Sequence, residues 1–254
     1  KYPVYSQPKL DGIRCIVRKD GMWSRNGKRI ISAPHIFEAL KHMFETNPNL
    51  ILDGELYTDK FANDFNAICS LVKKTKPTEQ DLRESAEKIE YHIYDVPSVK
   101  ASFMARYGYL TLLFLPKCCK VVETLSCESE TQAYELYEKY VNEGYEGQMI
   151  RLDAPYENKR SKSLLKRKEF TDGEFEILGV EEGKGNHAGK VGRLNFQING
   201  KAFDAAVNGD WEYIERLWKS KDGLIGKTAT VKYFELTEDG VPRFPKVIAI
   251  RDFE

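Results

Sequence analysis

The pattern of apolar residues changes near residues 169–173, and this change most limits how the chain can fold. Before it, short runs with strand-like alternation are interleaved with segments of helical spacing. After it, helical segments become scarce and strand-like segments between glycine turns dominate. These later strand-like segments are 175–182, 193–200, 228–236 and 246–253. We therefore predict two domains, a mixed one over residues 1–170 and a small β-barrel over residues 171–254, a size at which about five strands can close.

Turn signals and periodicity locate individual elements within this plan. Asp20-Gly21 and Asn26-Gly27 predict hairpin turns between short strands. Apolar spacing predicts strands over 50–57 and 91–96. It also predicts helices over 33–45, 78–88, 131–143 and 210–219, with Thr78 as the N-cap of the second.

Composition excludes several classes of protein. Lys+Arg and Asp+Glu both number 39, so any nucleic-acid binding must rest on a local basic surface. Residues 158–168 offer one, with six basic residues and no acidic residue. A membrane span needs about 18 consecutive apolar residues, and neither that nor a signal-peptide core occurs. The cysteines number five and none forms a Cys-x-x-Cys pair, so we expect an intracellular, cytoplasmic protein without zinc fingers.

Seven short segments along the chain contain charged or aromatic side chains that could take part in catalysis or binding. Lys9, at the end of an extended stretch and beside Asp11 and a glycine, could be an amine nucleophile or merely part of a charged turn. The ordered series makes the nucleophile the better interpretation. The segments are KLDGIR (9–14), SRNG (24–27), LDGEL (52–56), HIYDV (92–96), EGQMIR (146–151), LLKRK (164–168) and RFPKVIAIRD (243–252).

This series resembles the motifs of the covalent nucleotidyltransferase superfamily, and specifically those of ATP-dependent DNA ligases of the small two-domain phage and viral type. The resemblance implies an α+β fold. An ATP-grasp-like nucleotidyltransferase domain of antiparallel sheets with flanking helices would be followed by a C-terminal OB-fold barrel. It also implies three phosphoryl transfers. A lysine attacks ATP and carries AMP, AMP moves to the 5′-phosphate of a DNA nick, and the 3′-hydroxyl displaces AMP.

The resemblance also implies roles for residues around the nucleotide. Lys9 would carry AMP, with Lys166 and Lys168 on the α-phosphate. Alternation along a strand would point both into the pocket and Arg167 away from it. Four further residues would complete the nucleotide pocket. They are Gln7 at the adenine edge, Tyr94 stacked on adenine, Glu55 at the ribose, and Glu146, with Glu55, as the candidate Mg²⁺ ligands.

Other residues would face DNA or pyrophosphate. Asp11 would order the reacting groups at the nick, Arg14 would contact ribose or the nick phosphate, and Arg25 would bind the 5′-phosphate. Arg243 and Arg251 would arrange pyrophosphate during the first step. Asp53 precedes a glycine at a strand end, so we expect it to be only a turn former.

Three other functions remain open from the residues. An mRNA capping guanylyltransferase would use the same lysine chemistry with GTP. An RNA ligase would use ATP but usually carries a different second domain. A catalytically inactive nucleic-acid-binding module would lack the adduct on Lys9. The ligase interpretation predicts ATP and Mg²⁺ as cofactors, nicked duplex DNA as partner, a monomer, no membrane association, and roles in DNA replication, repair and recombination.

Overall fold

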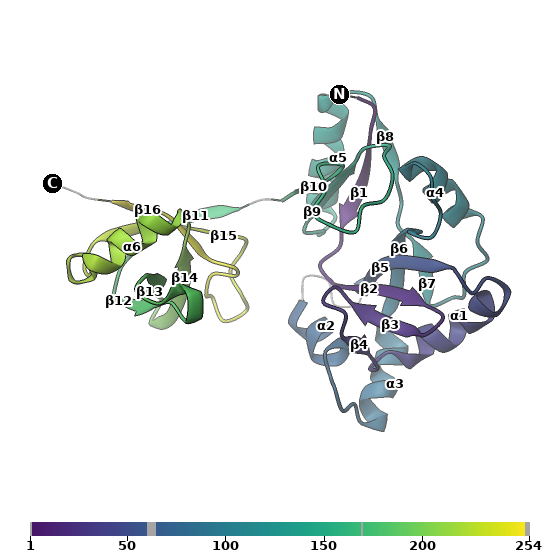
Figure 1. The fold of residues 1–254 in the computed structure, drawn as a ribbon, viewed down its shortest axis with the longest axis horizontal. Coiled ribbons are helices and arrows are strands. Elements are labelled where there is room, and N and C mark those ends of the chain that lie inside the picture. Colours follow the sequence, from purple (N-terminus) through teal and green to yellow (C-terminus); the bar gives the residue numbers. More distant parts are fainter. Residues whose placement is uncertain (1, 60–64, 169, 252–254) are drawn as a thin grey trace. The chain divides into compact units, whose positions relative to one another are not determined.

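The computed structural model describes residues 2–59, 65–168 and 170–251, and these form two units (Figure 1). The chain divides as Lys1–Arg167 and Lys168–Glu254. Residue 169, where the expected boundary begins, lies outside the described residues. We keep residues 1–170 and 171–254 as the proposed domains.

A six-stranded sheet forms one part of the first unit. Its strands are adjacent in the order β4-β3-β2-β5-β6-β7, and all pairs are antiparallel except β6 with β7. Gly21 and Gly27 have positive φ angles in the turns that join β2, β3 and β4, which confirms the two predicted hairpins. The strands are Ile13–Arg18 (β2), Gly21–Ser24 (β3), Arg29–Ile30 (β4), Ile51–Tyr57 (β5), Glu90–Asp95 (β6) and Cys119–Val121 (β7).

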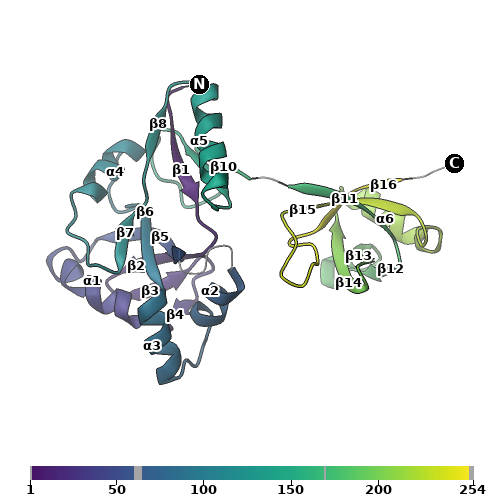
Figure 2. The ribbon, with the colours of Figure 1, turned by 180° about the vertical axis from the view of Figure 1, so that it is seen from behind.

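A four-stranded antiparallel sheet forms the other part of this unit. Its order is β10-β9-β1-β8, so the first strand lies beside a strand from the unit's far end. Helix α5 (Glu130–Asn142) lies along one face, where Gln148 Nε2 donates to the carbonyl of Ala133 at 2.8 Å (Figure 2). The strands are Val4–Lys9 (β1), Leu125–Cys127 (β8), Gly147–Arg151 (β9) and Leu164–Arg167 (β10).

Local signals mark the starts of two predicted helices. Thr78 caps α3 (Glu79–Lys88) in a capping box with Asp81, and this confirms the predicted N-cap. Pro34 opens α1 (Pro34–Thr46), a position where its missing N–H costs no helical bond. Two helices were not predicted from the sequence, α2 (Phe65–Val72) and α4 (Phe103–Thr111).

The core of the first unit lies between the six-stranded sheet and its helices. Ile36 and Leu40 of α1 and Ile68 of α2 are buried against the sheet. Gly54 permits close strand contact, because a Cβ there would lie 2.5 Å from the carbonyl oxygen of His92. A side chain at position 54 would therefore force β5 away from β6.

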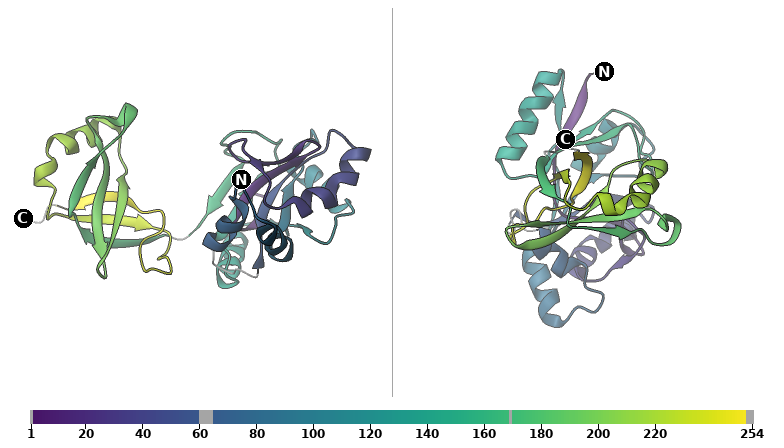
Figure 3. Two further views of the ribbon diagram at one scale, coloured as in Figure 1. Left: turned by 90° about the horizontal axis from the view of Figure 1, so that it is seen from below. Right: turned by 90° about the vertical axis from the view of Figure 1, so that its left-hand side faces the viewer.

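The second unit is a twisted and strongly curved six-stranded sheet with one α-helix among the described residues (Figure 3). The strand order is β11-β15-β16-β14-β13-β12, with β14 and β16 parallel. The predicted strand over 175–182 is two strands, and β14 was not predicted although Asn199-Gly200, both with positive φ, turns β13 into it. The elements are Thr171–Glu176 (β11), Gly179–Glu182 (β12), Val191–Ile198 (β13), Lys201–Val207 (β14), Trp211–Lys219 (α6), Thr228–Tyr233 (β15) and Lys246–Arg251 (β16).

These two units confirm the predicted α+β class, with sheets that are mainly antiparallel and helices that flank them. The sheet of the second unit has six strands among the described residues, and the β13–β14 hairpin supplies one that the sequence did not predict. Within the described part of the chain, no helix is both long and apolar enough to cross a membrane.

Candidate active site

Lys9 lies at the end of β1, next to the strand that carries the EGQMIR segment. Its Nζ contacts Oε2 of Glu146, and its carbonyl accepts the backbone N–H of Glu146 at 3.1 Å. The pair is largely enclosed, with the Lys9 side chain 18% exposed and the Glu146 side chain 6% exposed. Residues 137 positions apart are thus joined by the β1–β9 register, which also pairs Lys9 with Gly147.

Strand alternation separates the basic residues of β10. Lys166 pairs with Met149, and Met149 pairs with Gln7, so these three side chains lie on one face of the sheet. Lys9, two residues after Gln7, shares that face. Arg167 points to the opposite face, where its guanidinium lies 4.7 Å and 4.4 Å from the ring centroids of two α5 tyrosines, Tyr134 and Tyr137.

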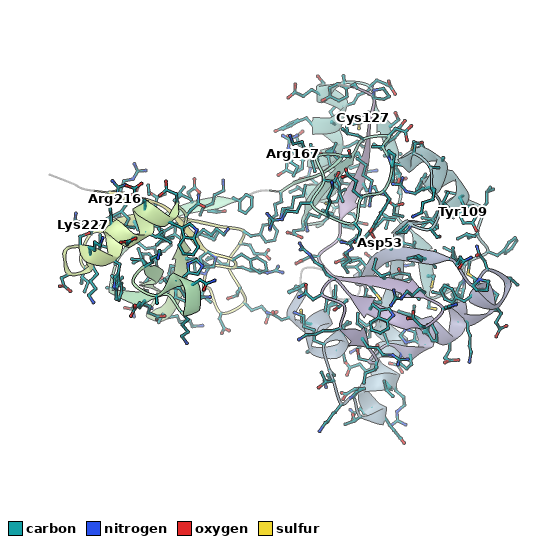
Figure 4. All side chains as sticks on the ribbon, in the orientation of Figure 1. Asp53, Tyr109, Cys127, Arg167, Arg216 and Lys227 are labelled. Carbon is teal, nitrogen blue, oxygen red and sulfur yellow. The ribbon has the colours of Figure 1, made fainter. Side chains whose placement is uncertain are left out.

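Arg14 is held by a buried carboxylate and a phenol. Its Nε and Nη2 donate to the two carboxylate oxygens of Asp53 at 2.9 and 2.7 Å. Asp53, only 2% exposed, lies on the part of β5 toward the four-stranded sheet (Figure 4). Although burial lowers the pKa of Arg14, the Asp53 carboxylate raises it overall. The expectation that Asp53 is only a turn former is therefore wrong, because its side chain anchors Arg14.

Glu55 and Tyr94 meet on neighbouring strands of the six-stranded sheet. Arg14 and Glu55 are register partners on β2 and β5, and the Tyr94 hydroxyl donates to Oε2 of Glu55 at 3.4 Å. Burial raises the pKa of Glu55 to about 8, against the lowering effect of Lys9 and Arg14. A carboxyl group whose pKa is shifted this far by burial is typical of a functional site.

A buried network that the sequence did not predict supports one wall of this region. Asp95 accepts hydrogen bonds from Arg106 Nε at 2.6 Å and from Arg151 Nη1 at 2.8 Å. Arg151 Nε donates to Oε1 of Gln7 at 2.7 Å, and Gln7 Nε2 donates to Thr124 at 2.8 Å. Asp95 lies within the HIYDV segment and Arg151 ends the EGQMIR segment, and this membership was the only sequence signal for them.

Arg151 also connects this network to Tyr94. Its guanidinium lies 5.3 Å from the centroid of the Tyr94 ring and 4.7 Å from that of Phe103. Such a cation fixes the plane of an aromatic ring by electrostatic attraction to its face. Tyr94 is thus oriented by both its hydroxyl and its ring.

Three other predicted site residues lie in a turn, in a loop and in the second unit. Arg25 is exposed in the β3–β4 turn, and Asp11 lies in the loop between β1 and β2. Lys168 begins the second unit, with Nζ 4.3 Å from the centroid of the Phe234 ring.

The two arginines of the RFPKVIAIRD segment are held by acids of their own unit. Arg243 Nη1 donates to Glu235 Oε1 at 2.5 Å. Arg251 Nε lies 3.5 Å from Glu174 Oε1 and donates to Thr230 at 3.0 Å. Residue 252, the end of the segment, lies outside the described residues.

Glu146 and Glu55 were the predicted metal ligands. Among the described residues, no three His, Cys, Asp or Glu side chains gather into a metal site. Mg²⁺ bound through substrate phosphates needs only one or two protein carboxylates, and Glu146 supplies one beside Lys9. The residues present therefore fit an ion that enters with a nucleotide.

Comparison with known proteins decides the family. The family described as "ATP dependent DNA ligase domain" matches residues 1–168, and "DNA ligase OB-like domain" matches residues 182–251. The chain belongs to the ATP-dependent DNA ligases. This confirms the resemblance, the nucleotidyltransferase-plus-OB architecture, and ATP as the nucleotide, and it favours a DNA ligase over an RNA ligase or a capping enzyme.

Individual ligases agree with this assignment. The DNA ligase of Haemophilus influenzae is 28% identical over 240 residues, which cover 93% of this chain and 82% of the relative. A DNA ligase of African swine fever virus is 25% identical, and the match covers 97% of this chain but 63% of the viral protein. DNA is therefore the class of substrate on which this enzyme acts.

Solved structures give the same result. A Lig E DNA ligase, from a study of DNA binding with a minimal scaffold, superposes with a TM-score of 0.81 at 25% identity, covering 98% of this chain and 92% of its own. The Chlorella virus DNA ligase-adenylate superposes with a TM-score of 0.51 at 25% identity, covering 100% and 94%.

Proposed function

We propose that this ligase seals nicks between a 3′-hydroxyl and a 5′-phosphate in duplex DNA through AMP carried on Lys9. The contact between Lys9 Nζ and Glu146 Oε2 carries this proposal, because it joins two distant motif segments around one enclosed amine. An amine at the end of a strand, held by a carboxylate, is oriented for attack on a phosphate.

The three steps exchange one bond for another. First, Lys9 Nζ forms a P–N bond to the α-phosphate, the bond to pyrophosphate breaks, and the amine loses its proton. Next, the 5′-phosphate of the nick attacks the same phosphorus, the P–N bond breaks, and the departing Lys9 amine takes up a proton. Last, the 3′-hydroxyl attacks the 5′-phosphate, AMP leaves, and the hydroxyl proton is lost. Each step needs charge stabilisation and in-line positioning.

We propose that the phosphates of the nucleotide bind against the sheet face that carries Lys9. Lys166 would lie against the α-phosphate, because it occupies the same face as Lys9 and Gln7. Lys168 would join it there. Glu146 would hold Mg²⁺, with Glu55 as the second candidate, and the ion would neutralise phosphate charge once the nucleotide is bound. Until then Glu146 holds the Lys9 ammonium.

We propose that the adenine and ribose of the nucleotide bind to side chains of β1, β5 and β6. Tyr94 would stack on adenine, since Arg151 and Glu55 fix its ring. Glu55 would accept hydrogen bonds from ribose hydroxyls. Gln7 would read the adenine edge through its second Nε2 hydrogen, since the contact to Thr124 uses one of the two.

The remaining residues are proposed to act on DNA and pyrophosphate. Arg14 would contact ribose or the nick phosphate, Asp11 would order the nick ends, and Arg25, exposed in its turn, would bind the 5′-phosphate. Arg243 and Arg251 would arrange pyrophosphate. We further propose an intracellular monomer, since ATP and DNA occur together inside cells.

A nick-sealing assay tests this function. The protein would be incubated with ATP, Mg²⁺ and a nicked duplex that carries a labelled 5′-phosphate, beside the same nick with RNA strands and beside GTP. We expect an ATP-dependent sealed product on DNA. An adduct formed only with GTP, or sealing only of RNA, would contradict the proposal.

Lys166→Ala is expected to slow adduct formation far more than Arg167→Ala. Loss of an ammonium beside the transferring phosphate costs about 100-fold or more, as for other preorganised charges. Arg167→Ala loses only its contacts with Tyr134 and Tyr137, so its rate should stay within a few-fold of the wild type. Single-turnover transfer of labelled AMP measures both rates, and equal losses would contradict the assignment of Lys166.

A further inference from the structure

Tyr156 lies in the segment between β9 and β10, before the basic run 158–168. The start of this segment is fixed to α4. The backbone N–H of Met104 donates to Asp153 Oδ1 at 2.8 Å, and Arg106 Nη1 donates to the carbonyl of Ala154 at 3.0 Å. Tyr156 is therefore presented to the six-stranded sheet from a firmly attached stretch of chain.

The Tyr156 hydroxyl closes a three-membered network with Arg14 and Asp53. It accepts a hydrogen bond from Arg14 Nη2 at 2.8 Å and donates one to Asp53 Oδ2 at 2.8 Å. A hydroxyl can do both at once, and a phenylalanine can do neither. The Asp53 side chain is 3% exposed and the Arg14 side chain 37% exposed, so the buried carboxylate is the anchor and the guanidinium the group held.

The network leaves one side of the Arg14 guanidinium for a ligand. The described contacts use Nε and Nη2, and Nη2 donates twice, to Asp53 and to Tyr156. The two hydrogens on Nη1 form the remaining part of the planar fork. The hydrogen bond from Nη2 to the Tyr156 hydroxyl helps to fix the direction in which Nη1 points.

We propose that Tyr156 is a positioning residue that orients Arg14 toward ribose or phosphate oxygens during ligation. This inference rests on the proposed role of Arg14. Without the hydroxyl, Arg14 keeps its two bonds to Asp53, but Nη2 loses one acceptor and Asp53 loses one donor. The guanidinium then turns more freely, and the correct orientation becomes one of several.

Tyr156→Phe tests the proposal, with Tyr109→Phe as matched control. Tyr109 lies on α4, well away from Asp53 (Figure 4), and has no described contact with Arg14. The first readout needs no catalysis. Phenylglyoxal would modify arginines, and mass mapping would give the rate at Arg14. We expect this rate to rise several-fold in Tyr156→Phe and not in Tyr109→Phe, and an unchanged rate would overturn the proposal whether or not the enzyme seals nicks.

The second readout is the rate of AMP transfer in a double-mutant cycle. We expect Tyr156→Phe to lower this rate about tenfold with little change in the KM for ATP, the effect of one hydrogen bond to a charged group. In an Arg14→Ala background the same change should have almost no further effect. Equal losses in both backgrounds would show that Tyr156 acts independently of Arg14 and would overturn the proposal. A wild type that forms no AMP adduct would instead contradict the proposed function.

Discussion

Lys9→Ala is expected to abolish adduct formation with ATP, by at least about a thousandfold, since no other amine can replace a lost nucleophile at the same position. The Lys9 side chain is enclosed against Glu146, at the end of a strand whose register fixes it. Transfer of labelled AMP from ATP, followed on a denaturing gel, measures the loss. Sealing with ATP should disappear with it.

Two controls test whether the loss is specific to Lys9 and to the formation of the adduct. Lys41→Ala removes an exposed α1 lysine and should leave the adduct unchanged. A nick that already carries AMP bypasses the first two steps, so Lys9→Ala should still seal it. An AMP adduct of undiminished yield on the Lys9 variant would identify another nucleophile.

The same substitution should also affect stability. Glu146 is nearly buried, and removal of Lys9 leaves its carboxylate without the ammonium it contacts. We expect Lys9→Ala to lower the free energy of unfolding by on the order of 2 kcal/mol, less than for a fully buried pair because Lys9 is partly exposed. Adding Glu146→Gln removes the carboxylate charge that Lys9 no longer contacts and should restore part of the loss in a denaturant titration.

Glu55→Gln is expected to stabilise the fold at pH 8 while it impairs the enzyme. The pKa of Glu55 in the folded protein is about 8, above its ordinary value of 4.5, because burial penalises the carboxylate. The unfolded chain therefore loses this proton first as pH rises. The contribution of Glu55 to stability is full below pH 4.5 and is lost as pH rises through 8.

A neutral glutamine avoids this loss. The free energy of unfolding of Glu55→Gln should match the wild type near pH 4.5 and exceed it at pH 8 by on the order of 2 kcal/mol, allowing for partial exposure of the side chain. Urea titrations at the two pH values measure the difference. Glu45→Gln, an exposed change on α1, should show no such pH dependence.

The activity of Glu55→Gln should move in the opposite direction. If ribose hydroxyls donate to the ionised form of Glu55, the amide of glutamine is a weaker acceptor than that carboxylate, and AMP transfer should fall by about 100-fold. A protein thus retains a destabilising buried carboxyl group because its binding site uses it. A variant that gained stability and kept full activity would contradict the role proposed for Glu55.

Local sequence patterns predicted much of this fold for a physical reason. Strand alternation is a two-residue property, so it assigned Lys166 and Arg167 to opposite faces without knowledge of the neighbouring strands. Capping is equally local, and Thr78 was placed correctly. The motifs could be recognised in order because each consists of adjacent residues. The α2 and α4 helices lacked such signals and were missed.

The missing parts of the site depend on long-range register. Asp53 seemed a turn former because its partners, Arg14 and Tyr156, are 39 and 103 residues away. Asp95, Arg106 and Arg151 form a network only because two sheets and α4 converge.

The sequence by itself therefore determined many of the element types, the order of motifs and the opposite faces of Lys166 and Arg167 on β10. Only the tertiary structure decided which carboxylate holds which cation. That choice depends on strand pairing across more than a hundred residues, as in the contact between Lys9 and Glu146. Local sequence does not encode such pairing, because it is fixed by the packing of whole sheets.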